Sequence, residues 1–264
     1  MRDMKKAFIA EQTKKLGLGR IDRRQFITSM LAAGVVLPTA MSMAGKAQAA
    51  TPKKGGKFRV GMAHGSTTDS LDPATYENGM MTGTGYMYGN NLTVVNAKGE
   101  LEPELAESYE SSDAKTWVFK LRKGVEFHNG KSMTAEDVIA SFNHHLGEAS
   151  KSAGKGLLKP VQSMKADGDA VVFELDAPNA DFPYIVSDYH LLIKPSKDGK
   201  IDPTDGLGTG GYIIDKFEPG VRTLAKRNPN YFKSDAAFFD TVEFGSLIDL
   251  TARQNALMSG EVHA

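Results

Sequence analysis

The sequence contains no cysteine. This absence excludes disulfide bonds, thiolate metal sites, cysteine nucleophiles and the acylated cysteine of a bacterial lipoprotein. Common catalytic motifs are missing too, because there is no GxSxG elbow for a serine nucleophile and no HExxH pair. Residues 124–132 carry five residues, not four, between the glycines of a phosphate loop, and Gly83, Gly85 and Gly89 miss the dinucleotide spacing by one. The sequence therefore predicts neither an enzyme nor a cofactor.

Histidine is present, but not in a metal-binding pattern. His144 and His145 are adjacent on a predicted helix, about 100° apart, and so do not share a face as an i, i+4 pair does. No carboxylate stands at a matching spacing. We expect surface or packed histidines and no metal site.

Long apolar runs are also scarce. The one uncharged stretch, Phe26 to Ala44, is close to the roughly 20 residues of a membrane-spanning helix, but hydroxyl residues, Gly34 and Pro38 dilute it. A basic segment precedes this stretch, and the small-residue site Ala47, Gln48, Ala49 follows it. This order is typical of an export signal, and it predicts cleavage after Ala49 rather than a membrane anchor.

Residues 22–28 (DRRQFIT) resemble the twin-arginine signal, with Arg23 and Arg24 as its two arginines. Lys46, near the cleavage site, is also typical of that class. The resemblance implies export of an already folded chain by the twin-arginine translocase. With no cysteine to acylate, the cleaved protein is expected to be free in the periplasm.

Charge is balanced over the whole chain but not along it. The predicted signal, residues 1–49, holds 9 of the 32 Lys and Arg and 3 of the 32 Asp and Glu, so the remainder carries 23 − 29 = −6. An acidic chain argues against a nucleic-acid partner, which would need a basic surface. The 264 − 49 = 215 remaining residues are enough for a buried core.

Alternating and helical patterns predict a mixed α and β fold. Strands are expected at 57–62, 116–121 and 241–246, and hairpins at 161–176 and 212–227. A glycine-weakened helix is expected within 78–92, and an amphipathic helix at 250–258. Thr134 and Asp137 resemble a capping box, which starts a helix that runs to about His145.

Several segments, in order, match one family pattern. They are KFRVGM (57–62), SLDP (70–73), the block from Leu101 to Phe142, GTGGY (208–212), KRNPNYF (226–232) and ALMSGEV (256–262). The chain resembles the peptide and nickel class of ABC-transporter substrate-binding proteins (bacterial family 5). The resemblance covers nearly all of residues 57–264. Within the central block we expect Trp117, Phe119, Phe127 and His128 to pack as scaffold.

The resemblance implies an α/β, periplasmic-binding-protein-like fold (class II, cluster C) with two lobes that close over a ligand and then dock on a membrane permease and its ATPase. The first lobe would comprise residues 50–78 and 162–264, with an extra subdomain at 79–161. Family chains are about twice this length, so we expect a truncated chain whose second lobe is missing. Most residues that grip the ends of a peptide lie in that lobe.

By resemblance, the candidate ligand-binding residues are the loop Ser66, Thr67, Thr68 and Asp69, together with Gly210, Gly211 and Tyr212. An extended polar loop can pair with a peptide backbone, and a glycine pair allows close backbone approach. An ordinary polar turn is the alternative for Ser66 to Asp69. Three positions depart from the family pattern: Gly211 replaces a proline, Phe232 a tryptophan and His263 an aspartate.

The leading hypothesis is a periplasmic binding protein that captures di- or oligopeptides for an ABC importer. Nickel-chelate, opine and oligosaccharide binders on the same scaffold are the alternatives. An exported hydrolase has no motif in its favour. A half-protein with an exposed cleft would instead be an interaction module or a non-functional fragment.

Overall fold

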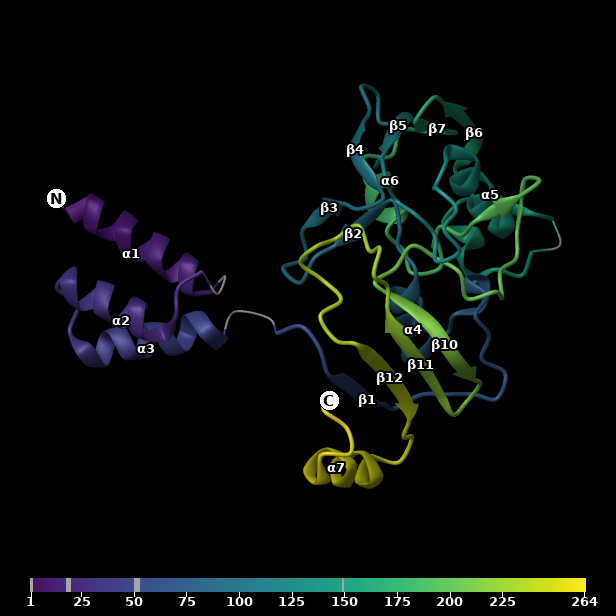
Figure 1. The fold of residues 1–264 in the computed structure, drawn as a ribbon. Helices are drawn as coiled ribbons and strands as arrows, with labels where there is room; N and C mark the ends of the chain where they lie inside the picture. The colour runs from purple at the N-terminus through teal and green to yellow at the C-terminus, as the bar shows by residue number, and fades with distance from the viewer. Residues whose placement is uncertain (1, 18–19, 50–52, 149) are drawn as a thin grey trace. The chain divides into compact units, whose positions relative to one another are not determined.

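The computed structural model describes residues 2–17, 20–49, 53–148 and 150–264. They form two compact units, Met1–Lys54 and Gly55–Ala264 (Figure 1). The cleavage position predicted after Ala49 adjoins residues 50–52, which lie outside the described residues.

The first unit consists of three helices, α1 (Arg2–Gly17), α2 (Arg23–Ala32) and α3 (Leu37–Ala49). A capping box starts α2, because Asp22 Oδ1 accepts from Gln25 N at 2.8 Å and Gln25 Oε1 accepts from Asp22 N at 2.9 Å. Arg23 and Arg24 are therefore the first two residues of this helix, and both are exposed. Gly34, with φ +74°, lies between α2 and α3 and interrupts the uncharged stretch.

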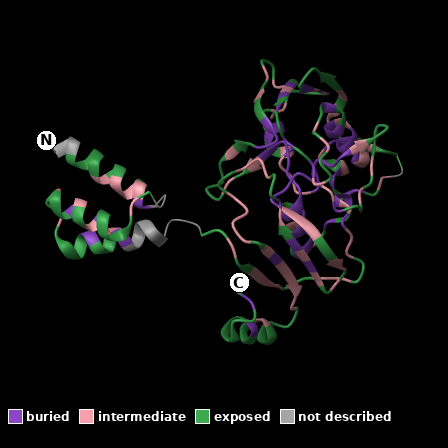
Figure 2. Ribbon diagram, viewed as in Figure 1, coloured by how far each residue is buried: buried purple, intermediate pink, exposed green. Residues whose placement is uncertain are grey.

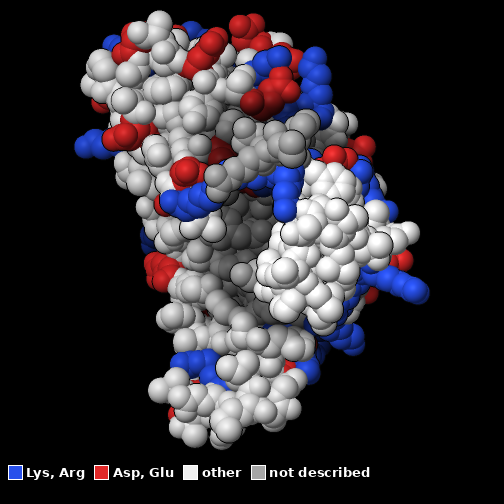
Figure 3. Space-filling view, turned by 90° about the vertical axis from the view of Figure 1, so that its left-hand side faces the viewer, with Lys and Arg blue, Asp and Glu red and all other residues white. Residues whose placement is uncertain are grey.

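Apolar side chains from all three helices form a small core, comprising Leu16, Phe26, Met30, Ala40 and Ala44. Residues 25–45 carry no acidic or basic side chain. Figure 3 shows a rounded white surface without blue or red side chains on one face of the protein. In the described part of the chain, no helix combines the length and apolar character that a membrane crossing requires.

The second unit contains a four-stranded sheet, here called the mixed sheet, in the order β1–β12–β11–β10. β1 (Lys57–Met62) lies parallel to β12 (Thr241–Ser246), and β10 (Tyr212–Glu218) and β11 (Arg222–Arg227) continue the sheet antiparallel. The strands predicted at 57–62 and 241–246 and the hairpin at 212–227 are confirmed. The first strand of this unit therefore pairs with one of its last.

Helix α4 (Gly79–Tyr88) packs against the mixed sheet, and its glycines make this possible. A Cβ on Gly83 would lie 2.8 Å from the Phe244 ring. Asn78 caps α4 with its side chain, and a 3₁₀ turn (Pro73–Thr75) precedes it. The predicted glycine-weakened helix is thus confirmed, and packing rather than propensity stabilises it.

A second, fully antiparallel sheet has the order β4–β5–β7–β6 and is here called the subdomain sheet. Its strands are β4 (Ala106–Glu110), β5 (Thr116–Leu121), β6 (Val161–Asp167) and β7 (Ala170–Leu175), and α5 (Ala135–Leu146) packs on it. The predicted strand, hairpin and helix are confirmed. Asp137 Oδ2 accepts from Thr134 N at 2.9 Å, as the capping prediction requires.

Shorter elements complete the second unit. They are β2 (Thr93–Val95) paired with β3 (Leu101–Pro103), a 3₁₀ turn (Ala153–Gly156), α6 (Phe182–Ile185), and β8 (Ser196–Lys197) paired with β9 (Lys200–Ile201). Helix α7 (Leu250–Ser259) follows β12 and buries only Ala256. It is therefore not the amphipathic helix predicted for 250–258.

The sheet topology also alters the predicted boundary at residues 161 and 162. β6 and β7 pair with β5 rather than with β10–β12, so the hairpin belongs with the subdomain sheet. The local alternation identified the hairpin, but strand pairing across more than 40 residues decided its sheet. The division into lobe and subdomain stays a proposal, with residues 161–175 moved to the subdomain.

Candidate functional site

The loop Ser66 to Asp69, predicted to contact ligand, is a closed turn. Asp69 Oδ2 accepts from Ser66 N at 2.8 Å, Asp69 N donates to Ser66 O at 2.9 Å, and the Ser66 and Thr68 hydroxyls lie 2.7 Å apart. Asn78 Nδ2 donates to Asp69 Oδ1 and ties the turn to the start of α4. The turn is therefore not the extended loop expected for strand pairing, although Thr67 and Thr68 remain exposed.

Gly210 and Gly211 are buried, and their close backbone approach is made within the chain. A Cβ on Gly210 would overlap the carbonyl group of Tyr88, and Gly210 N donates to Tyr88 O at 2.8 Å. The Gly210 carbonyl also accepts from Asn228 Nδ2 at 3.0 Å. Gly210 therefore positions the end of α4, and ligand contact at these glycines stays a prediction.

Tyr212, the third member of this group, has its hydroxyl 3.2 Å from Phe239 N, which donates to it. It begins β10, and the Ser66 turn packs at the other end of the β10–β11 hairpin, because a Cβ on Gly220 would lie 2.9 Å from Thr67 N. The seven residues of β10 extend over roughly 20 Å. The structure therefore does not bring the two predicted groups together.

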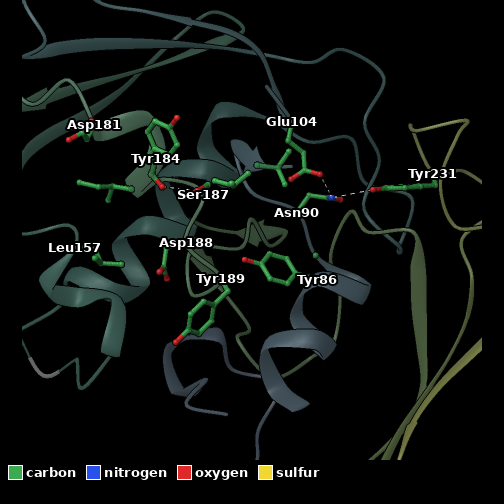
Figure 4. Close-up of a pocket in the computed structure, with 14 residues that line it drawn as sticks. Tyr86, Asn90, Glu104, Leu157, Asp181, Tyr184, Ser187, Asp188, Tyr189 and Tyr231 are labelled. Carbon is green, nitrogen blue, oxygen red and sulfur yellow. Dashed lines mark hydrogen bonds between the residues drawn. The ribbon is translucent and has the colours of Figure 1, made fainter. Parts of the chain in front are cut away.

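A cavity of about 730 Å³ lies instead where α4, β2 and α6 meet (Figure 4). Its volume is in the range of small-molecule sites, about 300 to 1,000 Å³. Aromatic and acidic side chains dominate the lining: Tyr86, Tyr184, Tyr189, Tyr231, Glu104, Asp181 and Asp188. The remaining lining residues are small, apolar or amide side chains: Gly89, Asn90, Val94, Val95, Leu157, Ile185 and Ser187.

At one end of the cavity, Glu104 belongs to a closed polar network (Figure 4). Its carboxylate is buried, accepts from Asn90 Nδ2 at 2.9 Å and forms an ion pair with Lys233. Asn90 Nδ2 also donates to the Tyr231 hydroxyl at 3.2 Å, and Thr209 Oγ1 donates to Asn90 Oδ1 at 3.0 Å. The polar side chains at this end of the cavity therefore already have partners within the chain.

At the other end, Asp188 is held by His190. Asp188 Oδ1 accepts from His190 N at 3.0 Å and pairs with His190 Nδ1 at 2.7 Å. Burial would raise the pKa of Asp188, but these hydrogen bonds outweigh it and lower the pKa, so the carboxylate is ionised at neutral pH. His190 Nε2 lies 2.8 Å from Tyr76 O, which fixes the imidazole.

Tyr86 and Tyr189 lie near this carboxylate, as Figure 4 shows. Burial raises the pKa of both phenols, and the charge of Asp188 raises each further. Both hydroxyls therefore stay protonated and can donate hydrogen bonds. Tyr86 is 50% exposed, so much of its ring is open to a ligand.

His144 and His145 have ordinary structural partners. His144 Nε2 lies 2.8 Å from Asp72 Oδ1, while His145 Nδ1 lies 2.6 Å from Ser152 Oγ. No cluster of three or more metal-ligating side chains occurs among the described residues. Trp117, Phe119 and Phe127 are buried, which confirms their expected role in packing. His128 supports the glycine turn, with Nε2 3.0 Å from Gly210 O.

Sequence reasoning did not identify the cavity residues. They come from segments between residues 86 and 231, and no motif joins them. The composition of residues 182–190 (FPYIVSDYH) could have indicated them, because two tyrosines, an aspartate and a histidine occur there together with a buried apolar run. Polar aromatics within such a run indicate a half-open surface rather than a core strand.

Residues 100–264 match the family described as bacterial extracellular solute-binding proteins, family 5 Middle. Di/tripeptide-binding protein 1 of Pseudomonas aeruginosa is 29% identical over 222 residues, which cover 72% of this chain and 41% of that protein.

Two solved structures share the fold. AgaA of A. tumefaciens R10, in complex with agropinic acid, has a TM-score of 0.72 and 27% identity, over 78% of this chain and 43% of that one. DppA of Helicobacter pylori, in complex with the peptide STSA, has a TM-score of 0.68 and 27% identity, over 80% and 46%. The periplasmic-binding-protein-like α/β fold is thus confirmed. The chain spans less than half the length of each of these relatives.

Proposed function

Since the chain belongs to the family 5 bacterial extracellular solute-binding proteins, we propose that it serves as the substrate-binding component of an ABC importer and captures small peptides. The observation that carries the proposal is the cavity of about 730 Å³, which tyrosines and carboxylates line. The protein that contains it shares its fold with a relative that was solved in complex with a peptide. Such a lining offers apolar ring faces and hydrogen-bond acceptors, which suit the side chain and N–H groups of a peptide.

The two ends of the cavity support a binding role rather than catalysis. Asp188 is held by His190 and Glu104 by Lys233, and none of the 14 lining residues is a cysteine nucleophile or a histidine that could activate one. We assign ligand contact to the cavity tyrosines and to the exposed hydroxyls of Thr67 and Thr68 in the Ser66–Asp69 turn. Gly210 instead contacts the end of α4 through the Tyr88 backbone.

The full 264-residue chain can be tested by thermal shift with di- to pentapeptides. A ligand that binds only the folded chain at 100 times its Kd stabilises it by about 2.7 kcal/mol, which moves the melting temperature by several degrees. Tyr86→Ala should reduce this shift, whereas Leu250→Ala, which removes an exposed apolar side chain outside the cavity, should not. If no peptide shifts the melting temperature but another solute does, the peptide assignment is wrong.

A different solute is the second candidate. The structural relative in complex with agropinic acid favours this alternative, since a non-peptide ligand is bound on the same fold. Including agropinic acid and nickel–histidine complexes in the thermal-shift panel separates the two possibilities.

We further propose that residues 1–49 are a twin-arginine signal cleaved after Ala49, and that the protein then acts in the periplasm with an inner-membrane permease and ATPase. Support comes from Arg23 and Arg24, exposed at the start of α2, ahead of the uncharged stretch. Replacing both with lysine should abolish export in a fractionation assay, while Lys14→Gln should not. Equal export of both variants would contradict the assignment.

A further inference from the structure

We infer that the cavity selects ligands with a positively charged group, an amine or a guanidinium, and that this group binds at the Asp188 end. The inference rests on the proposed function, because it concerns the ligand of the same site. It adds a chemical class that the family resemblance does not specify.

Charge on the lining has one sign. Glu104, Asp181 and Asp188 contribute carboxylates, and none of the 14 lining residues is Lys, Arg or His. A cavity with low-dielectric walls and charge of one sign concentrates ligands of the opposite sign. The lining therefore favours cations over anions.

The two ends of the cavity differ in how well they can bind a ligand cation. Lys233 neutralises Glu104, and its ammonium group also lies 5.7 Å from the centre of the Phe232 ring, which holds it in place. A ligand cation near Glu104 would compete with this lysine. Asp188 has no Lys or Arg partner among the described residues and pairs with the His190 imidazole, which is charged only when it is protonated. Attraction for a ligand cation is therefore stronger at Asp188 than at Glu104 whenever His190 is neutral.

Asp188 is also preorganised. His190 engages Oδ1 through both its backbone N–H and its ring, while the side chain remains 27% exposed at the cavity. The second carboxylate oxygen, Oδ2, has no hydrogen-bond partner within the part of the chain that the structure describes. A charge-assisted hydrogen bond from an ammonium or guanidinium group can form at this oxygen without breaking the His190 contact.

Two aromatic rings complete the cation site. The ring centres of Tyr189 and His190 lie 4.0 Å apart, with the planes tilted by 33°, and Tyr189 also lines the cavity. Tyr86 lies near Asp188 and is half exposed. A cation over a tyrosine face gains up to about 2 kcal/mol when it is desolvated, so carboxylate and rings act on the same group.

The test uses isothermal titration calorimetry of the full chain at pH 7 with three N-acetylated tripeptides, which lack an α-ammonium group and differ only at the central residue: acetyl-Ala-Lys-Ala, acetyl-Ala-Gln-Ala and acetyl-Ala-Glu-Ala. We expect the lysine peptide to bind about tenfold more tightly than the glutamine peptide, and the glutamate peptide to bind most weakly. Raising the salt from 0.05 to 0.5 M should reduce the lysine preference, because the Debye length shortens.

Variants locate the effect. Asp188→Asn should abolish the lysine preference and leave affinity for the glutamine peptide unchanged, and Tyr189→Leu should reduce the preference without removing a charge. Asp167→Asn removes a carboxylate at the end of β6, outside the cavity, and should bind like the parent chain. If Asp188→Asn fails to fold, as judged by circular dichroism, the Tyr189→Leu and salt measurements decide the matter.

The outcomes separate the two proposals. Equal affinity for the three peptides, or a lysine preference that survives in Asp188→Asn, overturns the cation site and leaves the proposed peptide function standing. Binding of none of the three peptides contradicts the proposed function, and the cation site is rejected with it.

Discussion

The two sheets of the second unit bury their side chains to different extents (Figure 2). The subdomain sheet and α5 enclose a large aromatic core, in which Phe173 packs against Phe119, Phe142 and Phe182 with ring centres 5.1 to 5.4 Å apart. The mixed sheet has smaller apolar clusters, and most residues of β1, β10 and β12 are only partly buried. Stability is therefore concentrated in the subdomain, while the mixed sheet provides the frame that holds α4 beside the cavity.

The largest expected effect comes from the subdomain core. Phe173→Ala should lower the free energy of unfolding by about 3 to 5 kcal/mol, because the cavity left by the ring cannot be filled by its aromatic neighbours. Phe58→Ala, in the mixed sheet, is the matched variant and should cost about 1 to 2 kcal/mol, since Phe58 is partly buried. Urea unfolding followed by fluorescence of Trp117, the only tryptophan, measures the subdomain directly. Equal costs would contradict the contrast between the sheets.

Acid should also weaken the subdomain. Burial, reinforced by the charge of His144, lowers the pKa of His145 on α5 to about 4. The unfolded chain has the ordinary value near 6.5, so it binds more protons between pH 6.5 and 4 and stability falls as the pH drops. Across this pH range, the free energy of unfolding should fall by about 3 kcal/mol.

The pKa of His190 shifts in the opposite direction to that of His145. Although its burial lowers the pKa, its pairing with Asp188 outweighs this and raises the pKa, so its contribution is lost as the pH rises. Because the lowered pKa of His145 causes the loss of stability in acid, His145→Gln should flatten the dependence of stability on pH between pH 4 and 6.5. His64 is exposed, and His64→Gln should leave this dependence unchanged. A wild-type slope in His145→Gln would exclude this residue as the cause.

A smaller effect is expected where the mixed sheet meets α4. Gly210→Ala places a Cβ against the Tyr88 backbone, which cannot move aside, and should cost about 2 kcal/mol. Gly245→Ala, on β12, has no atom within 4 Å of the added Cβ and serves as the control. Chemical denaturation of both variants provides the comparison. If Gly210→Ala left the free energy of unfolding unchanged, the backbone at the end of α4 would have to move to accommodate the added methyl group.

The smallest effect is expected at α7, beyond the mixed sheet. Leu257 is 53% and Met258 is 87% exposed, so Leu257→Ala should change the free energy of unfolding by less than about 0.5 kcal/mol. Val138→Ala, on the buried face of α5, should cost several times more. Differential scanning fluorimetry of the two variants tests whether the helices differ as their burial indicates.

Local sequence patterns predicted most individual elements. The alternation TWVFKL corresponds to β5, and the Thr134–Asp137 cap starts α5, because both signals depend on neighbours within a few residues. The prediction of an amphipathic helix at 250–258 was wrong in its burial, since spacing alone does not show whether another element covers a helix face.

The candidate site was less predictable. The family resemblance pointed to Ser66–Asp69 and to Gly210–Tyr212, but the structure places these groups at opposite ends of β10. The cavity residues Tyr86, Glu104 and Asp188 have no local motif, and they meet only through the packing of α4, β2 and α6. Such contacts between distant segments leave no periodic signal in a single sequence.

The sequence by itself determined the family, the mixed α and β character and the acidic charge of residues 50–264, because composition and short-range order encode these properties. Tertiary structure alone decided that the β6–β7 hairpin joins β5, that Gly210 accommodates Tyr88, and that four tyrosines surround an acidic cavity. The physical reason is the range of the interactions. Caps and strand alternation are local, whereas sheet order and a binding cavity depend on which distant surfaces are buried together.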